Sequence, residues 1–208
     1  MKEEGNKIID VETVVDRKDD GKKSSGVRSS VFSTRAMAGM AIFAALSYGV
    51  SFLEFSVFPT SAVFFLKLDF SNVFIMLAGF MYGPLAALFV GIIKELLCLI
   101  GSSTFGVGQI ANAFVILVYV IPPSIVYLKY KGIKSVVLSL FVACVLQTVT
   151  ALLVNRFITF PLYGMAEAFA PAFWLIVAFN VIKSVSVSLL TLLLYKRISY
   201  VFERINIR

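Results

Sequence analysis

The sequence predicts an all-α integral membrane protein, a bundle of six transmembrane helices with both termini in the cytoplasm. Of the 208 residues, 59% are apolar and the mean hydropathy is +0.92, whereas soluble domains are roughly 45–50% apolar. The apolar region after Thr34 has room for six crossings of roughly 20 residues each. Residues 34–208 therefore form one membrane domain, with no space left for a soluble catalytic module.

The first 33 residues differ in composition from the rest of the chain. They contain seven acidic and seven basic residues together with Gly and Ser, a composition typical of disordered segments. The first apolar run begins after residue 35 and lacks a small-residue cleavage pattern, so we do not expect a signal peptide. Residues 1–33 are predicted to be a disordered cytoplasmic tail.

The first two predicted helices occupy residues 35–55 and 72–82. Between them, Asp69 and Ser71 are residue types that favour a helix start. The second helix ends at Gly83 and is short for a membrane crossing. A short helix inside a bundle predicts a neighbouring loop that dips into the membrane.

The third and fourth helices are expected at residues 84–100 and 109–128. Pro84 suits the first turn of a helix, where its missing N–H would have no partner in any case. An uncharged, glycine-rich loop at residues 101–108 separates the two helices. Pro122-Pro123 are predicted to kink the fourth helix or to end its regular part.

The fifth and sixth helices are expected at residues 136–157 and 171–195. A basic turn at residues 129–134 precedes the fifth helix, and the segment of residues 160–164, with Pro161 and Gly164, is predicted to break it. The sixth helix ends at Lys196-Arg197.

The basic residues indicate which side of the membrane each connection occupies. Of the 19 Lys and Arg, eight lie in residues 1–35, three in residues 129–134 and four in residues 196–208. Six crossings place all three segments on one side, and the opposite loops hold only Lys67 and Arg156. Since cytoplasmic loops are enriched in Lys and Arg, this side is the cytoplasm. The net charge of +7 therefore indicates membrane topology and not nucleic-acid binding.

Several classes of function lack the residues that they need. The chain has no histidine, which is the commonest metal ligand and general base. Cys98 and Cys144 lie in apolar runs, where free cysteine is usually a small hydrophobic residue. We therefore expect no metal site, no catalytic residues and no enzymatic activity.

Four ionisable residues lie in or at the ends of the predicted helices: Glu54, Lys94, Glu95 and Lys183. Each such group costs roughly 2.5–3.5 kcal/mol on insertion scales, so it needs a partner or a function. Lys94 and Glu95 are adjacent, about 100° apart on a helix, and are not expected to face one another. Ligand binding by this pair and pairing with other helices for assembly remain equal alternatives.

The last helix contains a polar stripe inside an otherwise apolar sequence. Asn180, Lys183 and Ser184 share one helix face at spacings of three and four residues. An amide and an ammonium suit a ligand rich in carbonyl and ring-nitrogen acceptors. We favour ligand binding over internal pairing for this stripe.

Further polar residues gather toward the side opposite the basic loops, at Gln109, Asn112, Asn155 and Tyr163. Each alone is typical of an interhelical hydrogen bond. Together with the short second helix they predict a ligand pocket open to the outside of the cell.

Small residues are concentrated in the first half of the first helix. Ala41 and Ala45 form a small-xxx-small pair, which allows another helix to approach closely. Packing inside the bundle and docking of an external helix are both compatible with this pattern.

In order and spacing, the chain resembles the substrate-binding S components of energy-coupling factor (ECF) vitamin transporters, most closely the riboflavin-specific ones. The stretches with this resemblance are residues 64–71, 78–86, 93–97, 106–112, 155–157, 161–164 and 179–183.

The resemblance implies a multi-pass protein of a prokaryotic plasma membrane that captures riboflavin as its transported ligand, without a cofactor. It implies docking onto a membrane-embedded coupling protein that works with two ATPase subunits. Asn180 and Lys183 match residues that contact the isoalloxazine ring, and Ala41 and Ala45 match the contact with the coupling protein. The chain has no phosphate-binding loop of its own. The alternatives are an S component for another vitamin or precursor and, less favoured, a stand-alone secondary transporter.

Overall fold

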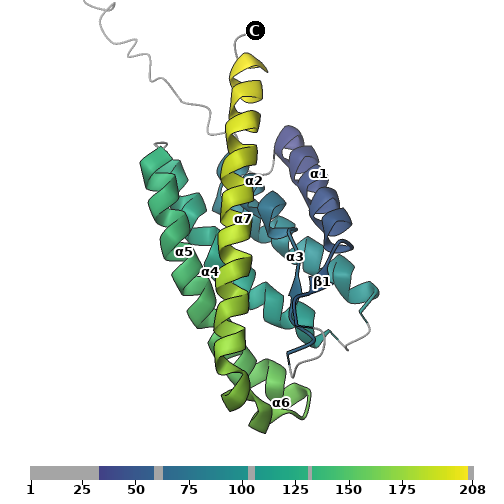
Figure 1. The fold of residues 1–208 in the computed structure, drawn as a ribbon. Helices are drawn as coiled ribbons and strands as arrows, with labels where there is room; N and C mark the ends of the chain where they lie inside the picture. Colours follow the sequence, from purple (N-terminus) through teal and green to yellow (C-terminus); the bar gives the residue numbers. More distant parts are fainter. Residues whose placement is uncertain (1–32, 59–62, 103–105, 131–132, 206–208) are drawn as a thin grey trace, which may run out of the picture.

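The computed structural model describes residues 33–58, 63–102, 106–130 and 133–205. The predicted tail therefore lies outside the described residues, except for Ser33, whose hydroxyl accepts a hydrogen bond from the backbone N–H of Ala36 at the start of the first helix. The described chain forms a bundle of six helical rods (Figure 1). The prediction of an all-α, six-helix bundle is confirmed.

The helices follow the predicted order, and the second and third match the prediction at both ends. The fifth rod is continuous from α5 through a π-helix into α6. The elements are α1 (Thr34–Ser51), β1 (Phe55–Ser56), β2 (Lys67–Leu68), α2 (Asn72–Tyr82), α3 (Pro84–Ile100), α4 (Val107–Lys129), α5 (Ile133–Val154), η3 (Asn155–Thr159), α6 (Phe160–Leu162), the 3₁₀ turn η4 (Ala166–Ala168) and α7 (Phe169–Ile205).

The connection between α1 and α2 contains a short hairpin that the sequence pattern did not predict. Helix α1 ends at Ser51, four residues before the predicted end. The chain then forms β1, which pairs antiparallel with β2, so that Phe55 lies opposite Leu68. Two-residue strands are too short to show an alternating pattern in a sequence, which explains why they were missed.

Prolines end neither the fourth nor the fifth rod. Helix α4 continues through Pro122 and Pro123 to Lys129, although each proline removes a backbone donor and crowds the carbonyl group four residues earlier. The predicted break at residues 160–164 is confirmed, since the rod continues through Pro161 and ends at Leu162. Gly164, with φ +69°, follows the helix end and adopts the left-handed conformation that favours glycine.

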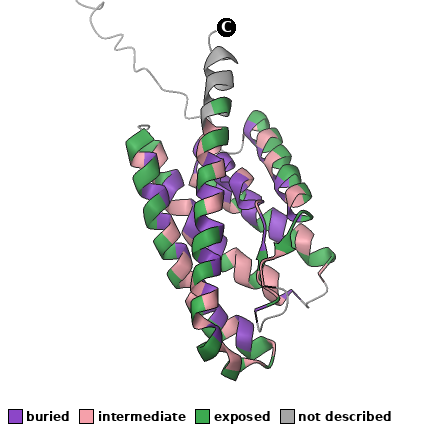
Figure 2. Ribbon diagram, viewed as in Figure 1, coloured by how far each residue is buried: buried purple, intermediate pink, exposed green. Residues whose placement is uncertain are grey.

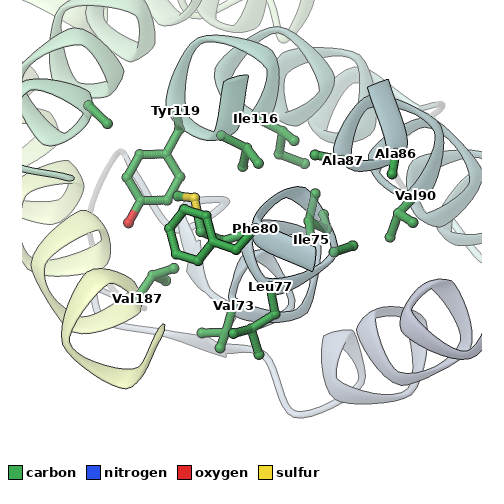
Figure 3. Packing of buried hydrophobic residues seen from close by; sticks show 14 of the residues in the cluster. Val73, Ile75, Leu77, Phe80, Ala86, Ala87, Val90, Ile116, Tyr119 and Val187 are labelled. Atoms are coloured by element: carbon green, nitrogen blue, oxygen red, sulfur yellow. The ribbon is translucent and has the colours of Figure 1, made fainter. Parts of the chain in front are cut away.

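Helix α2 is the centre of the hydrophobic core. It is buried on nearly all sides by α1, α3, α4 and α7, and Figure 3 shows Ile75 and Phe80 among side chains of these neighbours. An apolar helix without a polar face is typical of a buried position. Gly83, with φ +96°, then reverses the chain so that α3 packs back on α2.

Three helical segments of the described chain are long and apolar enough to cross a membrane by themselves: Val107–Lys129, Ile133–Leu162 and Ala166–Tyr195. Helices α1, α2 and α3 are shorter, with 18, 11 and 17 residues. Exposed residues follow the outer faces of α5 and α7 (Figure 2), where large apolar side chains such as Phe141 and Leu189 are more than half exposed. In a bilayer these faces contact lipid.

Candidate functional site

A cavity of about 450 Å³ lies in the part of the bundle that contains η3 and the β1–β2 hairpin. The end of α1, the β1–β2 connection, the end of α3, the start of α4, η3 and the middle of α7 form its walls. Eight of the nine predicted ligand residues line it: Lys94, Glu95, Gln109, Asn112, Asn155, Tyr163, Asn180 and Lys183.

Ser184 is the one predicted ligand residue outside the cavity lining. Its side chain is fully buried and its hydroxyl donates to the carbonyl oxygen of Val181, 3.1 Å away. Its own carbonyl oxygen accepts a hydrogen bond from the Tyr119 hydroxyl on α4. Ser184 thus joins α7 to α4, and its position does not support a ligand contact.

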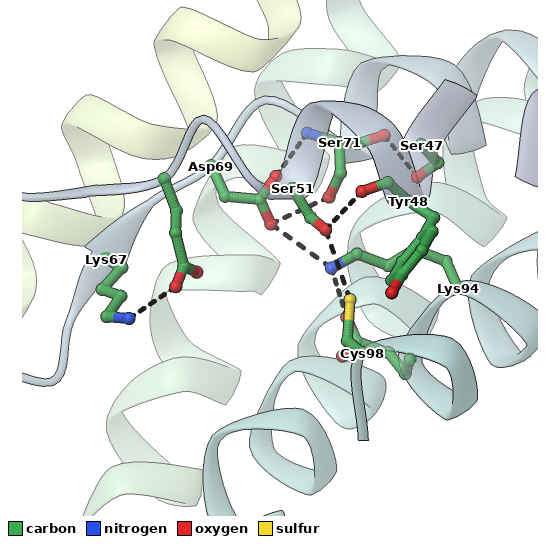
Figure 4. A network of polar contacts seen from close by, with 10 residues as sticks. Ser47, Tyr48, Ser51, Lys67, Asp69, Ser71, Lys94 and Cys98 are labelled. Carbon is green, nitrogen blue, oxygen red and sulfur yellow. Dashed lines mark hydrogen bonds and ion pairs between the residues drawn. The ribbon is translucent and has the colours of Figure 1, made fainter. Parts of the chain in front are cut away.

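Two acidic residues and Lys94 form a buried ion cluster at one wall of the cavity (Figure 4). The Lys94 ammonium lies 3.3 Å from a carboxylate oxygen of Asp69 and 2.8 Å from one of Glu95. The expectation that Lys94 and Glu95 do not face one another is therefore wrong. The reason is the long, flexible lysine stem, which bends the ammonium back to the neighbouring carboxylate although the two Cα–Cβ bonds diverge.

Asp69 has a larger role than the helix start that its position predicted. Its carboxylate accepts hydrogen bonds from the backbone N–H and the hydroxyl of Ser71, and Ser71 makes no side-chain cap on α2. Burial by itself raises the pKa of Asp69, but the ammonium groups of Lys94 and Lys183 and the bonds from Ser71 outweigh burial and lower it. One feature of the sequence indicates that Asp69 is buried and paired, namely that its carboxylate lies among apolar residues.

The same wall is joined to α1 by hydroxyl contacts. The Ser47 hydroxyl donates to the carbonyl oxygen of Ser71, 2.9 Å away, and Ser51 lies 3.4 Å from the sulfur of Cys98 on α3. Helix α1, the segment before α2 and helix α3 therefore meet at this cluster (Figure 4).

Lys183 on α7 has no such partner. Its side chain is 5% exposed, lines the cavity, and makes no hydrogen bond or ion pair with any residue that the structure describes. Asn180, one turn away, donates from its amide nitrogen to the carbonyl oxygen of Ile176. The Lys183 ammonium is close enough to Asp69 for the two charges to interact, yet it makes no direct bond with a described residue, so it can donate hydrogen bonds to an acceptor of a ligand in the cavity.

Three polar atoms of the lining are buried and make no hydrogen bond within the described part of the chain: Glu95 Oε2, Asn155 Oδ1 and Thr159 Oγ1. Buried polar atoms in folded proteins nearly always have a partner. Thr159 was not predicted as a site residue, because one threonine in an apolar helix has no distinguishing signal. These atoms point to a site that a polar ligand completes.

Aromatic side chains form another part of the lining. The rings of Phe65 and Tyr163 lie 5.0 Å apart at an angle of 36°, and Phe179 of α7 also lines the cavity. At the same connection Lys67 pairs with Glu54, and both side chains are partly exposed. The cavity therefore offers apolar, flat surfaces beside its charged groups.

The charges around the cavity balance. Among the described lining residues there are three carboxylates, on Glu54, Asp69 and Glu95, and three ammonium groups, on Lys67, Lys94 and Lys183. An uncharged ligand with several acceptors fits such a lining better than a strongly charged one.

Ala41 and Ala45 of α1 lie outside the face with which this helix packs on the bundle. Ala36, Met40 and Ala44 are buried, whereas Ala41 and Ala45 are exposed. Packing inside the bundle, one of the two alternatives, is therefore not the role of Ala41 and Ala45.

The comparisons with known proteins agree on one family. The family model for the substrate-specific component of ECF transporters matches residues 35–195. The riboflavin transporter RibU of Staphylococcus aureus (strain TCH60) is 29% identical over 176 residues, which are 80% of this chain and 91% of that protein. The riboflavin transporter FmnP of Bacillus subtilis (strain 168) is 32% identical over 102 residues, 48% of this chain and 54% of its own length. A solved structure of the S component of a bacterial ECF transporter superposes with a TM-score of 0.71 and 29% identity, covering 80% of this chain and 96% of that one.

Proposed function

The chain belongs to the substrate-specific components of ECF transporters, and on this premise we propose that it captures riboflavin from outside the cell for uptake. The observation that supports this most is the cavity. Its lining has balanced charge and contains aromatic side chains and the Lys183 ammonium, which forms an ion pair with none of the described residues. Riboflavin is uncharged, with a flat ring system and several carbonyl and ring-nitrogen acceptors. Both relatives named above are riboflavin transporters.

Each polar lining residue has a proposed role in this site. Lys183 and Asn180 donate hydrogen bonds to acceptors of the isoalloxazine ring, and the aromatic residues cover its faces. Lys94 fixes Glu95 and Asp69, so that Glu95 presents its free oxygen Oε2 to the ligand. The remaining ligand residues are Gln109, Asn112, Asn155 and Tyr163.

Import requires an energy source that the described chain does not provide, so we propose that a coupling membrane protein with two ATPase subunits supplies it. The exposed pair Ala41 and Ala45 on α1 is the proposed contact for a helix of the coupling protein. In this arrangement both termini are cytoplasmic, the cavity opens outward, and the protein resides in a prokaryotic plasma membrane. In Figure 1 the C-terminal end of α7 lies at the end of the bundle opposite α6, as this orientation requires.

The test is the identity of the ligand. The full-length protein, purified in mild detergent from cells grown with riboflavin, is expected to absorb at the flavin bands and to release riboflavin on denaturation. The apo protein is then titrated with riboflavin and with a panel of other vitamins. Saturable binding of another vitamin, with none of riboflavin, would replace the substrate and leave the family assignment in place.

A further inference from the structure

The lipid-facing sides of α5 and α7 change character at the end of the bundle that contains α6. Along most of their length they carry apolar side chains that are about half exposed: Val145, Val149 and Leu153 on α5, and Val181, Val185 and Leu189 on α7. Toward α6 the first series meets the exposed Arg156 in η3. The second series meets Trp174, which is 74% exposed.

The lengths of these two sides match the thickness of a bilayer. Trp174 and Tyr195 are 21 positions apart on α7, about 31 Å along the helix axis. Lys134 and Arg156 are 22 positions apart on the fifth rod, about 33 Å. The hydrocarbon core of a bilayer is about 30 Å thick, so both rods place its boundary at the α6 end at Arg156 and Trp174.

A series of ring contacts joins Arg156 to Trp174. The Arg156 guanidinium lies over the Phe169 ring, 5.3 Å from its centroid. Phe169 contacts Phe173, and Phe173 contacts Trp174, with centroids 6.2 and 5.3 Å apart. We call these four residues the arginine–aromatic patch. Arg156 makes no hydrogen bond or ion pair with any residue that the structure describes, so its N–H groups are available to an external acceptor.

The backbone beyond the patch supports the same boundary. Between α6 and α7 the chain passes through Gly164, with φ +69°, and the short turn η4, where Glu167 is exposed. Irregular backbone that contacts lipid does not occur within the hydrocarbon region. This connection therefore lies outside the hydrocarbon, on the far side of the patch.

We propose that the arginine–aromatic patch binds the phosphate group of phospholipids in this leaflet, which is the outer leaflet in the orientation given above. A guanidinium binds phosphate through two parallel N–H groups, and the Phe169 ring holds the guanidinium in place. Trp174 lies at headgroup level, where tryptophan is enriched. The patch thus fixes the depth of the bundle, so that Tyr163 of the cavity lining lies in the headgroup layer. The binding requires a bilayer and neither riboflavin nor a coupling protein.

The depth is tested with Trp174 as the probe, because it is the single tryptophan of the chain. The full-length protein without ligand is reconstituted into vesicles of phosphatidylcholine with bromine either near the headgroup end or near the methyl end of the acyl chains. Bromine quenches tryptophan fluorescence only at short range. We expect stronger quenching by the bromine near the headgroup, and stronger quenching by the deep bromine overturns the proposal.

The phosphate contact is tested with Arg156→Gln. In vesicles of phosphatidylcholine mixed with brominated phosphatidylglycerol, quenching of Trp174 measures the preference of the patch for the anionic lipid. One cation near a membrane surface should contribute about fivefold to this preference, and the variant should lose that factor. Lys134→Gln removes the same charge at the opposite end of the fifth rod and should leave the quenching of Trp174 unchanged.

A merely structural role for Arg156 predicts a lower melting temperature of Arg156→Gln in lipid-free detergent and an unchanged lipid preference. The proposal predicts the reverse, a nearly unchanged melting temperature and a lost preference. Arg156→Met removes the same charge, keeps a long side chain over Phe169, and is the second test if the glutamine variant does not fold. An unchanged preference for phosphatidylglycerol, or an equal loss in Lys134→Gln, overturns the proposal.

Discussion

Replacing Lys183 with methionine separates a ligand-binding role from a structural one. The substitution keeps an unbranched side chain of similar length and removes the ammonium, which is 5% exposed and lacks a partner among the described residues. A hydrogen bond to a charged group contributes about 1.5–3 kcal/mol. Riboflavin affinity is therefore expected to fall by roughly 10- to 150-fold.

The same substitution is expected to stabilise the protein without ligand. Burial of a charge that makes no direct ion pair is unfavourable by several kcal/mol. We expect this cost to exceed the attraction between Lys183 and Asp69, so Lys183→Met should raise the apo melting temperature. Isothermal titration with riboflavin and thermal unfolding in detergent measure the two effects. Lys134→Met, an exposed lysine at the start of α5, is the matched control and should change neither quantity.

A lower riboflavin affinity together with a higher apo melting temperature would distinguish a ligand-binding role of Lys183 from a structural one. Unchanged riboflavin affinity in Lys183→Met would refute the assignment of this residue to the site. A lower apo melting temperature would show that the ammonium has a stabilising partner and would refute the reasoning from burial.

Three further experiments test the docking face on α1, the packing of α2 against α4, and the buried ion cluster. Ala41→Leu combined with Ala45→Leu should leave riboflavin binding intact and abolish uptake by cells that contain the coupling proteins; preserved uptake would reject the docking face. Gly79→Ala should destabilise the fold by about 1–3 kcal/mol, since an added Cβ would lie too close to the Ser124 hydroxyl on α4. Gly49→Ala, at a helical position where an added Cβ meets no neighbour, should instead raise stability by up to about 1 kcal/mol in thermal unfolding. Asp69→Asn removes the charge that pairs with a buried ammonium and should lower the melting temperature, with an expected loss of about 3–5 kcal/mol; an unchanged melting temperature would contradict the buried ion cluster.

Helix boundaries in the core were predictable because local chemistry determines them. Gly83 and Pro84 fix the turn between α2 and α3, so that α2 ends at Tyr82 and α3 begins at Pro84. The polar face of α7 was equally visible, because Asn180 and Lys183 interrupt an apolar sequence at helical spacing.

The parts that were missed depend on contacts between distant residues or on backbone register. The partner of Lys94 is Asp69, which lies 25 positions earlier in the chain and on another element. Thr159 faces the cavity through a π-helical segment that no periodicity of 3.6 residues indicates. Ser184 shares a helix face with Asn180, but its carbonyl oxygen accepts a hydrogen bond from the Tyr119 hydroxyl of α4. This contact depends on how α4 and α7 pack and has no sign in the sequence.

The most direct test of the account is an experimental structure of the full-length protein with bound riboflavin. The account predicts the isoalloxazine ring inside the cavity, with an acceptor atom at about 2.7–3.2 Å from Lys183 Nζ. Riboflavin bound elsewhere, or bound in the cavity without contact to Lys183, would contradict it.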